Sequence, residues 1–199
     1  MSAGLIGCMT TPAQGNRIPD GAMYACDNGR FGQGWPGADA WFAWLTATVE
    51  RYGRDRCLWA VAPDVPLDAA GTLAESTPWL SKIRALGIPA AFAAQDGSEH
   101  GLIPWAAIDV LFLGGSTEWK LSQAAAGLVA EAKRRGKGAH MGRVNSERRL
   151  RHAAAAGCDT ADGTFLAFGP NANLPRVLSW GDRLRARPEV PPPPPTGAG

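Results

Sequence analysis

Short apolar runs alternate along the chain with longer segments in which apolar residues recur every three or four positions. The runs at 57–63, 88–94, 110–113 and 138–142 are mostly apolar, which is typical of parallel strands buried on both faces. The segments at 38–52, 69–86, 118–135 and 146–156 have the apolar spacing of helices. Strands alternating with helices predict an α/β fold with a parallel sheet.

Residues at the ends of the predicted helices support these boundaries. Ser146 is a suitable N-cap for the helix at 146–156, and Gly157 follows that helix directly. Gly87 and Gly136 stand just after two other predicted helices. The segments 159–162 and 164–168 complete the pattern as further strands.

A polar residue or a glycine follows almost every apolar run. The residues in these positions are Asp27, Asp64, Gln95, Gly114, Gly115, Arg143 and Asp162. Active-site residues of (β/α) barrels lie after the carboxyl ends of the strands, so this pattern predicts a TIM-type (β/α) barrel. Six or seven strands are recognisable, so either the barrel is truncated or the N-terminal residues supply a further strand. A doubly wound open sheet is the structural alternative, although the chain has no G-x-G-x-x-G or G-x-x-x-x-G-K-[ST] motif.

The composition predicts one soluble domain with a substantial core, since 45% of the 199 residues are hydrophobic and 19% are charged. We assign residues 1–182 to the barrel domain and residues 183–199, which include a run of prolines, to a disordered Pro-rich tail. Neither a membrane span nor a signal peptide is recognisable, which favours a cytoplasmic protein.

The four cysteines form no C-x-x-C pair, and the histidines do not stand at metal-ligand spacing from them. We therefore expect no structural zinc site, and we interpret the cysteines as small buried apolar residues.

Basic residues are concentrated in one segment although the net charge is only +2. The segment from Lys133 to Arg151 has eight basic residues, and Glu147 is its one acidic residue. Such a segment favours a polyanionic partner, for which a phosphate backbone is the leading candidate. The alternative is a solvated helix face.

Asp27 and Asp162 are the candidate catalytic residues. Two carboxylates in different environments can divide the roles of nucleophile and proton carrier. The alternative for Asp159 and Asp162 is a turn or a helix N-cap, which is a common use of loop aspartates.

The order of these segments resembles the tRNA-guanine transglycosylase superfamily, and most closely its short phage members that modify DNA. The segment 27–32 (Asp-Asn-Gly-Arg-Phe-Gly) is similar to the Asp-Ser-Gly-Gly-Phe-Gln segment of the family, and 157–162 has the spacing of its Gly-x-Asp-x-x-Asp run. The resemblance implies that Asp162 is the nucleophile, that Asp27 is the acid/base residue and that Asp159 supports them.

The same resemblance implies a pocket for a guanine-like base and a phosphate-binding surface. The implied base-binding residues are Asp64, Gln95, Gly114, Gly115, Met141 and Asp159, where the amides of the glycine pair face the base carbonyl. The implied nucleic-acid-binding residues are Arg143, Arg148, Arg149 and Arg151.

The activity implied by the resemblance is the exchange of guanine in DNA for a 7-deazaguanine base such as preQ0, through a covalent aspartyl-deoxyribosyl intermediate. DNA and the free base are the expected partners, no cofactor or membrane is required, and a homodimer is left open. The absence of the family's cysteine-rich zinc site disfavours tRNA as the substrate. The alternatives are a base or nucleoside hydrolase, a non-catalytic DNA-binding accessory module and, third, a tRNA-guanine transglycosylase.

Four further residues have open roles. Lys120 is either a surface helix lysine, which is the favoured interpretation, or a contact to a pocket or nucleic acid. Trp105 and Trp119 either pack in the protein or stack on a base. His140 is either a structural histidine, again the favoured interpretation, or a catalytic base.

Overall fold

The protein is an incomplete α/β barrel with seven parallel strands. The computed structural model describes residues 6–14, 17–32 and 34–186. The strands form one sheet in chain order: β1 (Cys8–Thr10), β2 (Tyr24–Cys26), β3 (Cys57–Val61), β4 (Ala90–Ala94), β5 (Val110–Leu113), β6 (Gly138–Met141) and β7 (Thr160–Ala161). Within the described residues β1 and β7 are the edges of this sheet, so the predicted barrel class is confirmed and the barrel is not closed.

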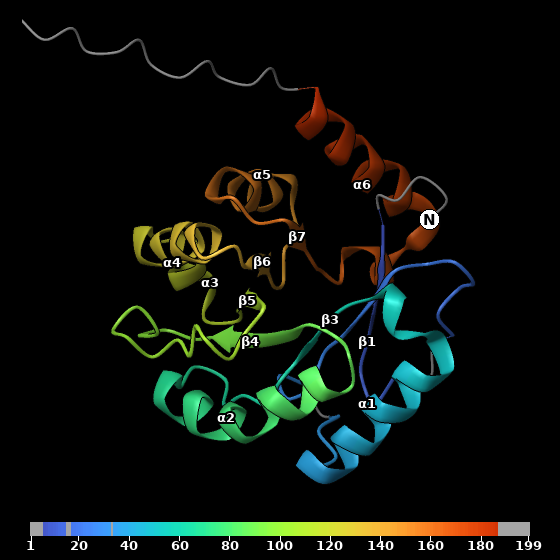
Figure 1. Cartoon of the computed structure of the whole chain (residues 1–199). Helices are drawn as coiled ribbons and strands as arrows, with labels where there is room; N and C mark the ends of the chain where they lie inside the picture. The colour runs from blue at the N-terminus through green and yellow to red at the C-terminus, as the bar shows by residue number, and fades with distance from the viewer. Residues whose placement is uncertain (1–5, 15–16, 33, 187–199) are drawn as a thin grey trace, which may run out of the picture.

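Helices lie around the curved sheet (Figure 1). They are α1 (Ala38–Tyr52), α2 (Ala69–Ala85), α3 (Thr117–Lys120), α4 (Gln123–Arg134), α5 (Glu147–Ala156) and α6 (Pro170–Arg185), with short 3₁₀ helices η1 (Arg54–Arg56) and η2 (Phe165–Phe168). Turns rather than helices connect β1 to β2 and β4 to β5. The helical capping signals are used as predicted: the Ser146 hydroxyl accepts a hydrogen bond from the amide of Arg149 at 3.3 Å, and Gly157 has a φ of 96°.

The structure differs from the sequence pattern in four places. The helix predicted at 118–135 is divided into α3 and α4, because the Ser122 hydroxyl caps a new helix by accepting from the amide of Ala125 at 3.3 Å. The segment predicted as a strand at 164–168 forms η2 instead. The pattern did not reveal β1 or α6, and α6 reaches Arg185, past the predicted start of the tail at 183. The rest of that predicted tail, 187–199, lies outside the described residues.

Two apolar clusters lie on the two sides of the sheet. The larger fills the space between sheet and helices and includes the fully buried Trp41, Leu80 and Phe92. The smaller lies on the inner side of the barrel, where Trp59 and Phe112 pack edge to face with ring centroids 5.6 Å apart. Alanines on the neighbouring strands leave room for these large rings. Their side chains fill the interior below the carboxyl ends of the strands, as in other barrels.

Strand register sets the level of the residues that follow the sheet. The last residues of four neighbouring strands are paired in register: Ala94, Leu113, Met141 and Ala161. The next residues therefore leave the sheet at one level: Gln95, Gly114, Gly142 and Asp162. This edge, together with the residues after β2 and β3, is called the rim below.

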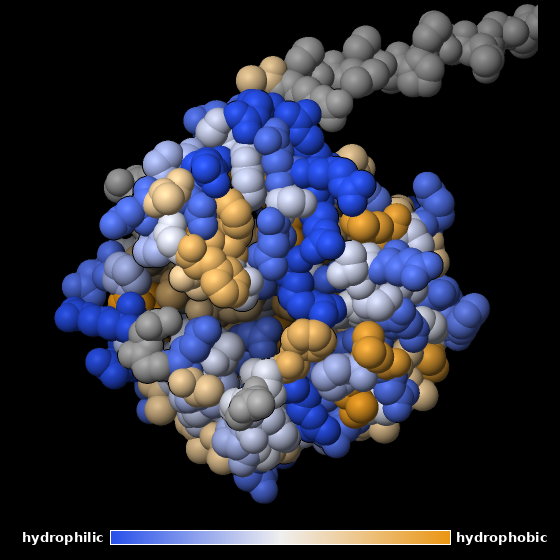
Figure 2. Space-filling model, turned by 180° about the vertical axis from the view of Figure 1, so that it is seen from behind, coloured by the Kyte–Doolittle hydropathy of each residue, from blue (hydrophilic) through white to orange (hydrophobic). Residues whose placement is uncertain are grey.

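Hydrophilic residues cover most of the face seen in Figure 2, and hydrophobic residues form separate small groups around a central recess.

In the described ranges, no helix combines the length and the apolar character needed to cross a bilayer.

Replacing a fully buried aromatic residue of β4 should destabilise the fold. We expect Phe92→Ala to lower the free energy of unfolding by about 3–5 kcal/mol, since it removes buried apolar surface and leaves a cavity. Phe168→Ala is the matched control, because that ring is 83% exposed and its loss should change the free energy by less than about 0.5 kcal/mol. Urea denaturation of both variants measures the difference. Equal effects would contradict the assignment of Phe92 to the core.

Candidate functional site

Three carboxylates from separate strands approach one another at the rim. Asp27 follows β2, Asp64 follows β3 and Asp162 follows β7. The amide of Gly29 donates to Oδ1 of Asp27 at 2.6 Å. Burial raises the pKa of Asp27 above its usual value, the Gly29 hydrogen bond opposes this shift, and the charge of Asp162 adds to it. Asp27 is therefore the carboxyl that holds a proton more strongly than an exposed aspartate would.

A buried histidine holds Asp162 from below. Nε2 of His140 lies 3.0 Å from Oδ1 of Asp162, and Nδ1 lies 2.8 Å from the Thr160 hydroxyl. An ionised carboxylate only accepts hydrogen bonds, so we assign the ring proton to Nε2 and the acceptor role to Nδ1. The ring is 2% exposed and lies 4.7 Å, centroid to centroid, from both Trp59 and Phe112. The fixed ring therefore fixes the orientation of Asp162.

Backbone contacts hold the same oxygen of Asp162. The amide of Arg143 donates to Oδ1 at 3.2 Å, so this oxygen has two donors. Among the described residues, none donates a hydrogen bond to Oδ2. The free oxygen is thus available to a water molecule or a substrate.

Asp64 belongs to a separate, buried network of amides. Nδ2 of Asn28 donates to Oδ1 of Asp64 at 2.9 Å, and Nε2 of Gln95 donates to Oδ2 at 2.7 Å. Oε1 of Gln95 accepts from the amide of Leu67 at 3.0 Å, so the Gln95 amide has one defined orientation. Burial raises the pKa of Asp64 to about 6, although the hydrogen bond from Asn28 acts in the opposite direction.

The predicted glycine pair contacts an arginine. The amides of Gly114 and Gly115 both donate to the carbonyl oxygen of Ala94, at 2.9 and 3.1 Å, while their own carbonyl oxygens accept from the guanidinium of Arg143. The guanidinium also lies 4.0 Å from the centroid of the Phe31 ring. In this arrangement the glycine amides are already engaged, and Arg143 is a rim residue rather than an exposed surface arginine.

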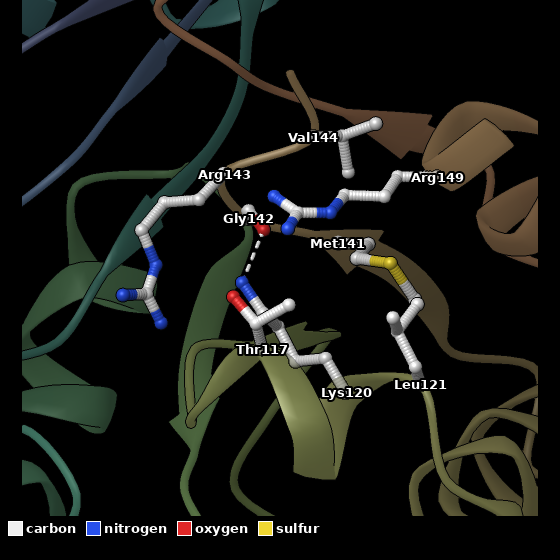
Figure 3. Close-up of a pocket in the computed structure, with 8 residues that line it drawn as sticks. All are labelled: Thr117, Lys120, Leu121, Met141, Gly142, Arg143, Val144 and Arg149. Atoms are coloured by element: carbon white, nitrogen blue, oxygen red, sulfur yellow. Dashed lines mark hydrogen bonds between the residues drawn. The ribbon is translucent and has the colours of Figure 1, made fainter. Parts of the chain in front are cut away.

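Lys120 lies inside the protein, so its interpretation as a surface lysine was wrong. It is 3% exposed, and its Nζ donates to the carbonyl oxygen of Gly142 at 2.6 Å. Figure 3 shows this ammonium group in a small pocket with the side chains of Thr117, Met141 and Arg149. The pocket lies next to Arg143, whose backbone holds Asp162.

Several predicted site residues lie elsewhere. Asp159 precedes β7 and lies at the amino end of the strands, where its carboxylate binds Nζ of Lys133 at 2.6 Å and the amide of Ala139 at 2.8 Å. Arg151 pairs with Glu147 at 2.7 Å, and Arg148 is exposed. Met141 and Arg149 line the same pocket, whereas Arg148 and Arg151 are not among its lining residues.

Four of the eight basic residues of the segment pair with acidic residues from inside and outside it. Lys133 pairs with Asp159, and Arg134 and Arg135 both pair with Glu131. The pair with Asp159 had no signal in the sequence because Asp159 is distant along the chain, whereas Glu131 stands at helical spacing from both arginines. The segment therefore does not form one uncompensated basic surface.

Two tryptophans considered for base stacking have other contacts. Nε1 of Trp119 donates to Glu99 at 2.9 Å, and the Trp119 side chain is buried. The Trp105 ring lies 5.3 Å from the guanidinium carbon of Arg135. Both tryptophans pack in the protein, as the favoured interpretation expected.

Sequence reasoning missed the partners that position the carboxylates. Asn28, directly after Asp27, is 3% exposed and binds Asp64. Its position at a strand end was the one available signal. The link between His140 and Asp162 has no sequence signal, because it depends on the pairing of β6 with β7.

The part of the chain that the structure describes has no group of three or more His, Cys, Asp or Glu side chains placed to hold a metal ion. The cysteines are free thiols. The rim therefore provides hydrogen bonds and charges, and we assign no metal ligands to it.

No family model matches the chain, and no curated protein matches it. Solved structures do match. YkuI of Bacillus subtilis, a protein with an EAL domain in complex with c-di-GMP and calcium, is 12% identical over 84% of this chain and 46% of that chain, with a TM-score of 0.47. The EAL domain of Xanthomonas citri FimX in complex with c-diGMP is 13% identical over 73% and 59%, with a TM-score of 0.48. A candidate glycerophosphoryl diester phosphodiesterase of Silicibacter pomeroyi is 17% identical over 80% and 51%, with a TM-score of 0.46.

This chain spans roughly half the length of these proteins, and at such identities and TM-scores the likeness assigns no activity to it. The identification of the chain as a relative of tRNA-guanine transglycosylases is contradicted, because the matching structures are EAL-domain proteins and glycerophosphodiester phosphodiesterases. The predicted base exchange, glycosyltransferase class, DNA partner and 7-deazaguanine ligand are corrected with it. The order of strand-end residues was the basis of that identification, and many barrels have polar residues at these positions.

The raised pKa of Asp64 should make the stability of the protein depend on pH. Its stabilising contribution is complete below the unfolded pKa of about 4 and is lost as pH rises through about 6, since the folded state binds the proton more tightly. We expect a loss on the order of 2–3 kcal/mol between pH 4 and pH 7.

Asp64→Asn should flatten this pH dependence, although the new amide would face the Gln95 donor and cost stability at every pH. Urea denaturation of both proteins at several pH values between 4 and 7 measures the slopes. Parallel curves for the two proteins would show that Asp64 is not the titrating group.

Proposed function

We propose that the chain is an enzyme that hydrolyses an ester at the rim, with Asp162 as the base and Asp27 as the proton donor. The observation that carries this proposal is the pair of neighbouring carboxylates in opposite environments. Oδ1 of Asp162 lies within hydrogen-bonding distance of two N–H donors and its Oδ2 has none among the described residues, whereas burial raises the pKa of Asp27 above its usual value. Such a division between two carboxyl groups is the arrangement that acid–base catalysis requires.

The catalytic roles of Asp162 and Asp27 follow from the oxygen of Asp162 that has no donor among the described residues and from the proton that Asp27 carries. Oδ2 of Asp162 would accept a proton from a water molecule as the water oxygen attacks the ester centre. The bond from that centre to the leaving oxygen would then break, and the Asp27 carboxyl would give its proton to that oxygen. A proton is thus taken at Asp162 and one is given at Asp27, so the step is balanced. Return of the proton from Asp162 to Asp27 through solvent would restore the starting state.

His140 acts through Asp162 in this scheme and is a positioning residue. Its Nε2–H holds Oδ1, and its ring cannot turn freely because it lies between Trp59 and Phe112. The interaction engages Oδ1 and leaves Oδ2 without a donor among the described residues.

Activity should depend on both carboxylates and in different ways. We expect Asp162→Asn to lower kcat by about 10²–10⁴-fold for every ester that the protein hydrolyses, because the base is lost. Asp27→Asn should affect esters of poor leaving groups much more than esters of 4-nitrophenol, since 4-nitrophenolate departs without protonation. Asp20→Asn is the matched control, because the Asp20 side chain is 91% exposed. A panel of carboxylic and phosphate esters with both kinds of leaving group, assayed by product release, measures these effects.

Full activity of Asp162→Asn, equal sensitivity of both ester classes to Asp27→Asn, or no hydrolysis of any ester would overturn the proposal.

The pH profile gives a separate prediction. Because Asp27 must carry its proton, kcat/KM for a poor leaving group should fall as pH rises through the raised pKa of Asp27. This alkaline limb should be absent for Asp27→Asn. An unchanged limb in that variant would assign the titration to another group.

A further inference from the structure

We infer that the pocket between Lys120 and Arg149 binds an oxygen atom of a phosphate group, which makes a phosphate ester the substrate class of the neighbouring rim. This inference rests on the proposed function, because it takes the rim as the reactive site. Figure 3 shows Lys120 and Arg149, together with Arg143, among the residues that line this small space.

Three cationic residues line this pocket, namely Lys120, Arg143 and Arg149, and the carboxylates of Asp162 and Asp96 lie near enough to act on Lys120. Within the described residues, neither Lys120 nor Arg149 forms an ion pair. Burial, together with the charges of Arg143 and Arg149, lowers the pKa of Lys120 to about 8, although Asp162 and Asp96 act in the opposite direction. Holding the buried Lys120 beside the half-buried Arg149 is costly unless an anion joins them. An anionic ligand would remove this cost.

The pocket also has unused hydrogen-bond donors. Nζ of Lys120 has three N–H bonds, and the carbonyl oxygen of Gly142 occupies one of them. The Thr117 hydroxyl and the Arg149 guanidinium line the same space. Ammonium and guanidinium donors form their strongest hydrogen bonds with phosphate and carboxylate oxygens.

The size of the pocket favours a single oxygen over a whole ligand. Its free space holds about one water-sized atom, and Met141 and Val144 form an apolar part of its wall. A phosphate group can place one oxygen there and direct its other substituents outward.

Chain connectivity relates this pocket to the reactive carboxylate. Gly142, whose carbonyl oxygen binds Lys120, immediately precedes Arg143, whose amide binds Asp162. This carbonyl and this amide belong to one trans peptide group, so Lys120 and Asp162 lie on opposite sides of it. The charge of Asp162 still acts on Lys120, and an ester held at Lys120 would have to extend past this peptide to reach Asp162.

The competing interpretation is that Lys120 has only a structural role, which is to fix the Gly142 carbonyl. A structural role makes no use of Arg149, and it predicts no affinity for anions. Arg149 is therefore the decisive residue, and Arg148 is its matched control because it is an exposed arginine on the same helix.

The first experiment measures binding without turnover. Inorganic phosphate is titrated at constant ionic strength, with sodium chloride as the comparison, into the ¹⁵N-labelled full chain while the amide signals of Thr117 and Gly142 are followed. We expect saturable shifts in the unchanged protein and in Arg148→Gln. We expect Kd to rise at least about tenfold in Arg149→Gln and in Lys120→Met, because each loses one charged donor. The same spectra show whether the Lys120→Met variant is folded. If it is not folded, the Kd of Arg149→Gln alone tests the inference.

Unchanged Kd in Arg149→Gln, or no saturable shift with phosphate, would overturn the inference. These results do not depend on Asp27 or Asp162, so the inference and the proposed function can fail separately.

The second experiment distinguishes the phosphate of a substrate from free phosphate. Inorganic phosphate should inhibit phosphate-ester hydrolysis competitively, and Arg149→Gln should raise KM for phosphate esters while leaving KM for uncharged carboxylic esters unchanged. Inhibition that is not competitive would assign the pocket to a free ion and would overturn its role in substrate binding.

Discussion

The register of the parallel strands is the constraint on which the site depends. Leu113 of β5 is level with Ala94 of β4 and with Met141 of β6, and β7 continues this level at Ala161. A shift of one residue in any of these pairings would turn its side chains to the other face of the sheet. His140 would then leave the barrel interior, and Asp162 would lose the hydrogen bond that orients it.

The packing of the barrel interior and the geometry of the rim therefore depend on the same residue, His140. His140 belongs to the inner layer through its contacts with Trp59 and Phe112, and it belongs to the rim through Asp162. Buried polar groups need partners, and Thr160 satisfies the second nitrogen of the ring. The apolar layer thus holds rigidly a group that would otherwise be free to rotate, which is how a barrel scaffold positions its functional side chains.

The periodic elements of the fold were predictable, whereas short elements and side-chain partners were not. The strand at 110–113 and the helix at 38–52 match the structure residue for residue, because each has a clear apolar pattern and defined ends. β1 has three residues, too few for any period to be recognised, whereas the two residues of β7 lie within the strand predicted at 159–162. The sequence placed Asp27, Asp64 and Asp162 after strands, but it did not distinguish them from Asp159, which lies at the opposite end of β7. That difference depends on a strand of two residues and on the pairing of Asp159 with Lys133.

The charges of the rim are divided between its two sides, and this division has a chemical consequence. Asp27 and Asp64 lie after β2 and β3, while Lys120 and Arg149 lie beyond β5 and β6. The segment from His140 to Arg143 contacts both Asp162 and Lys120, so it connects the acidic side of the rim to the cationic side. An anionic substrate would be attracted to the cationic side and repelled by unprotonated carboxylates on the other. The raised pKa values of Asp27 and Asp64 reduce that repulsion, since a carboxyl group that keeps its proton presents no negative charge to the ligand.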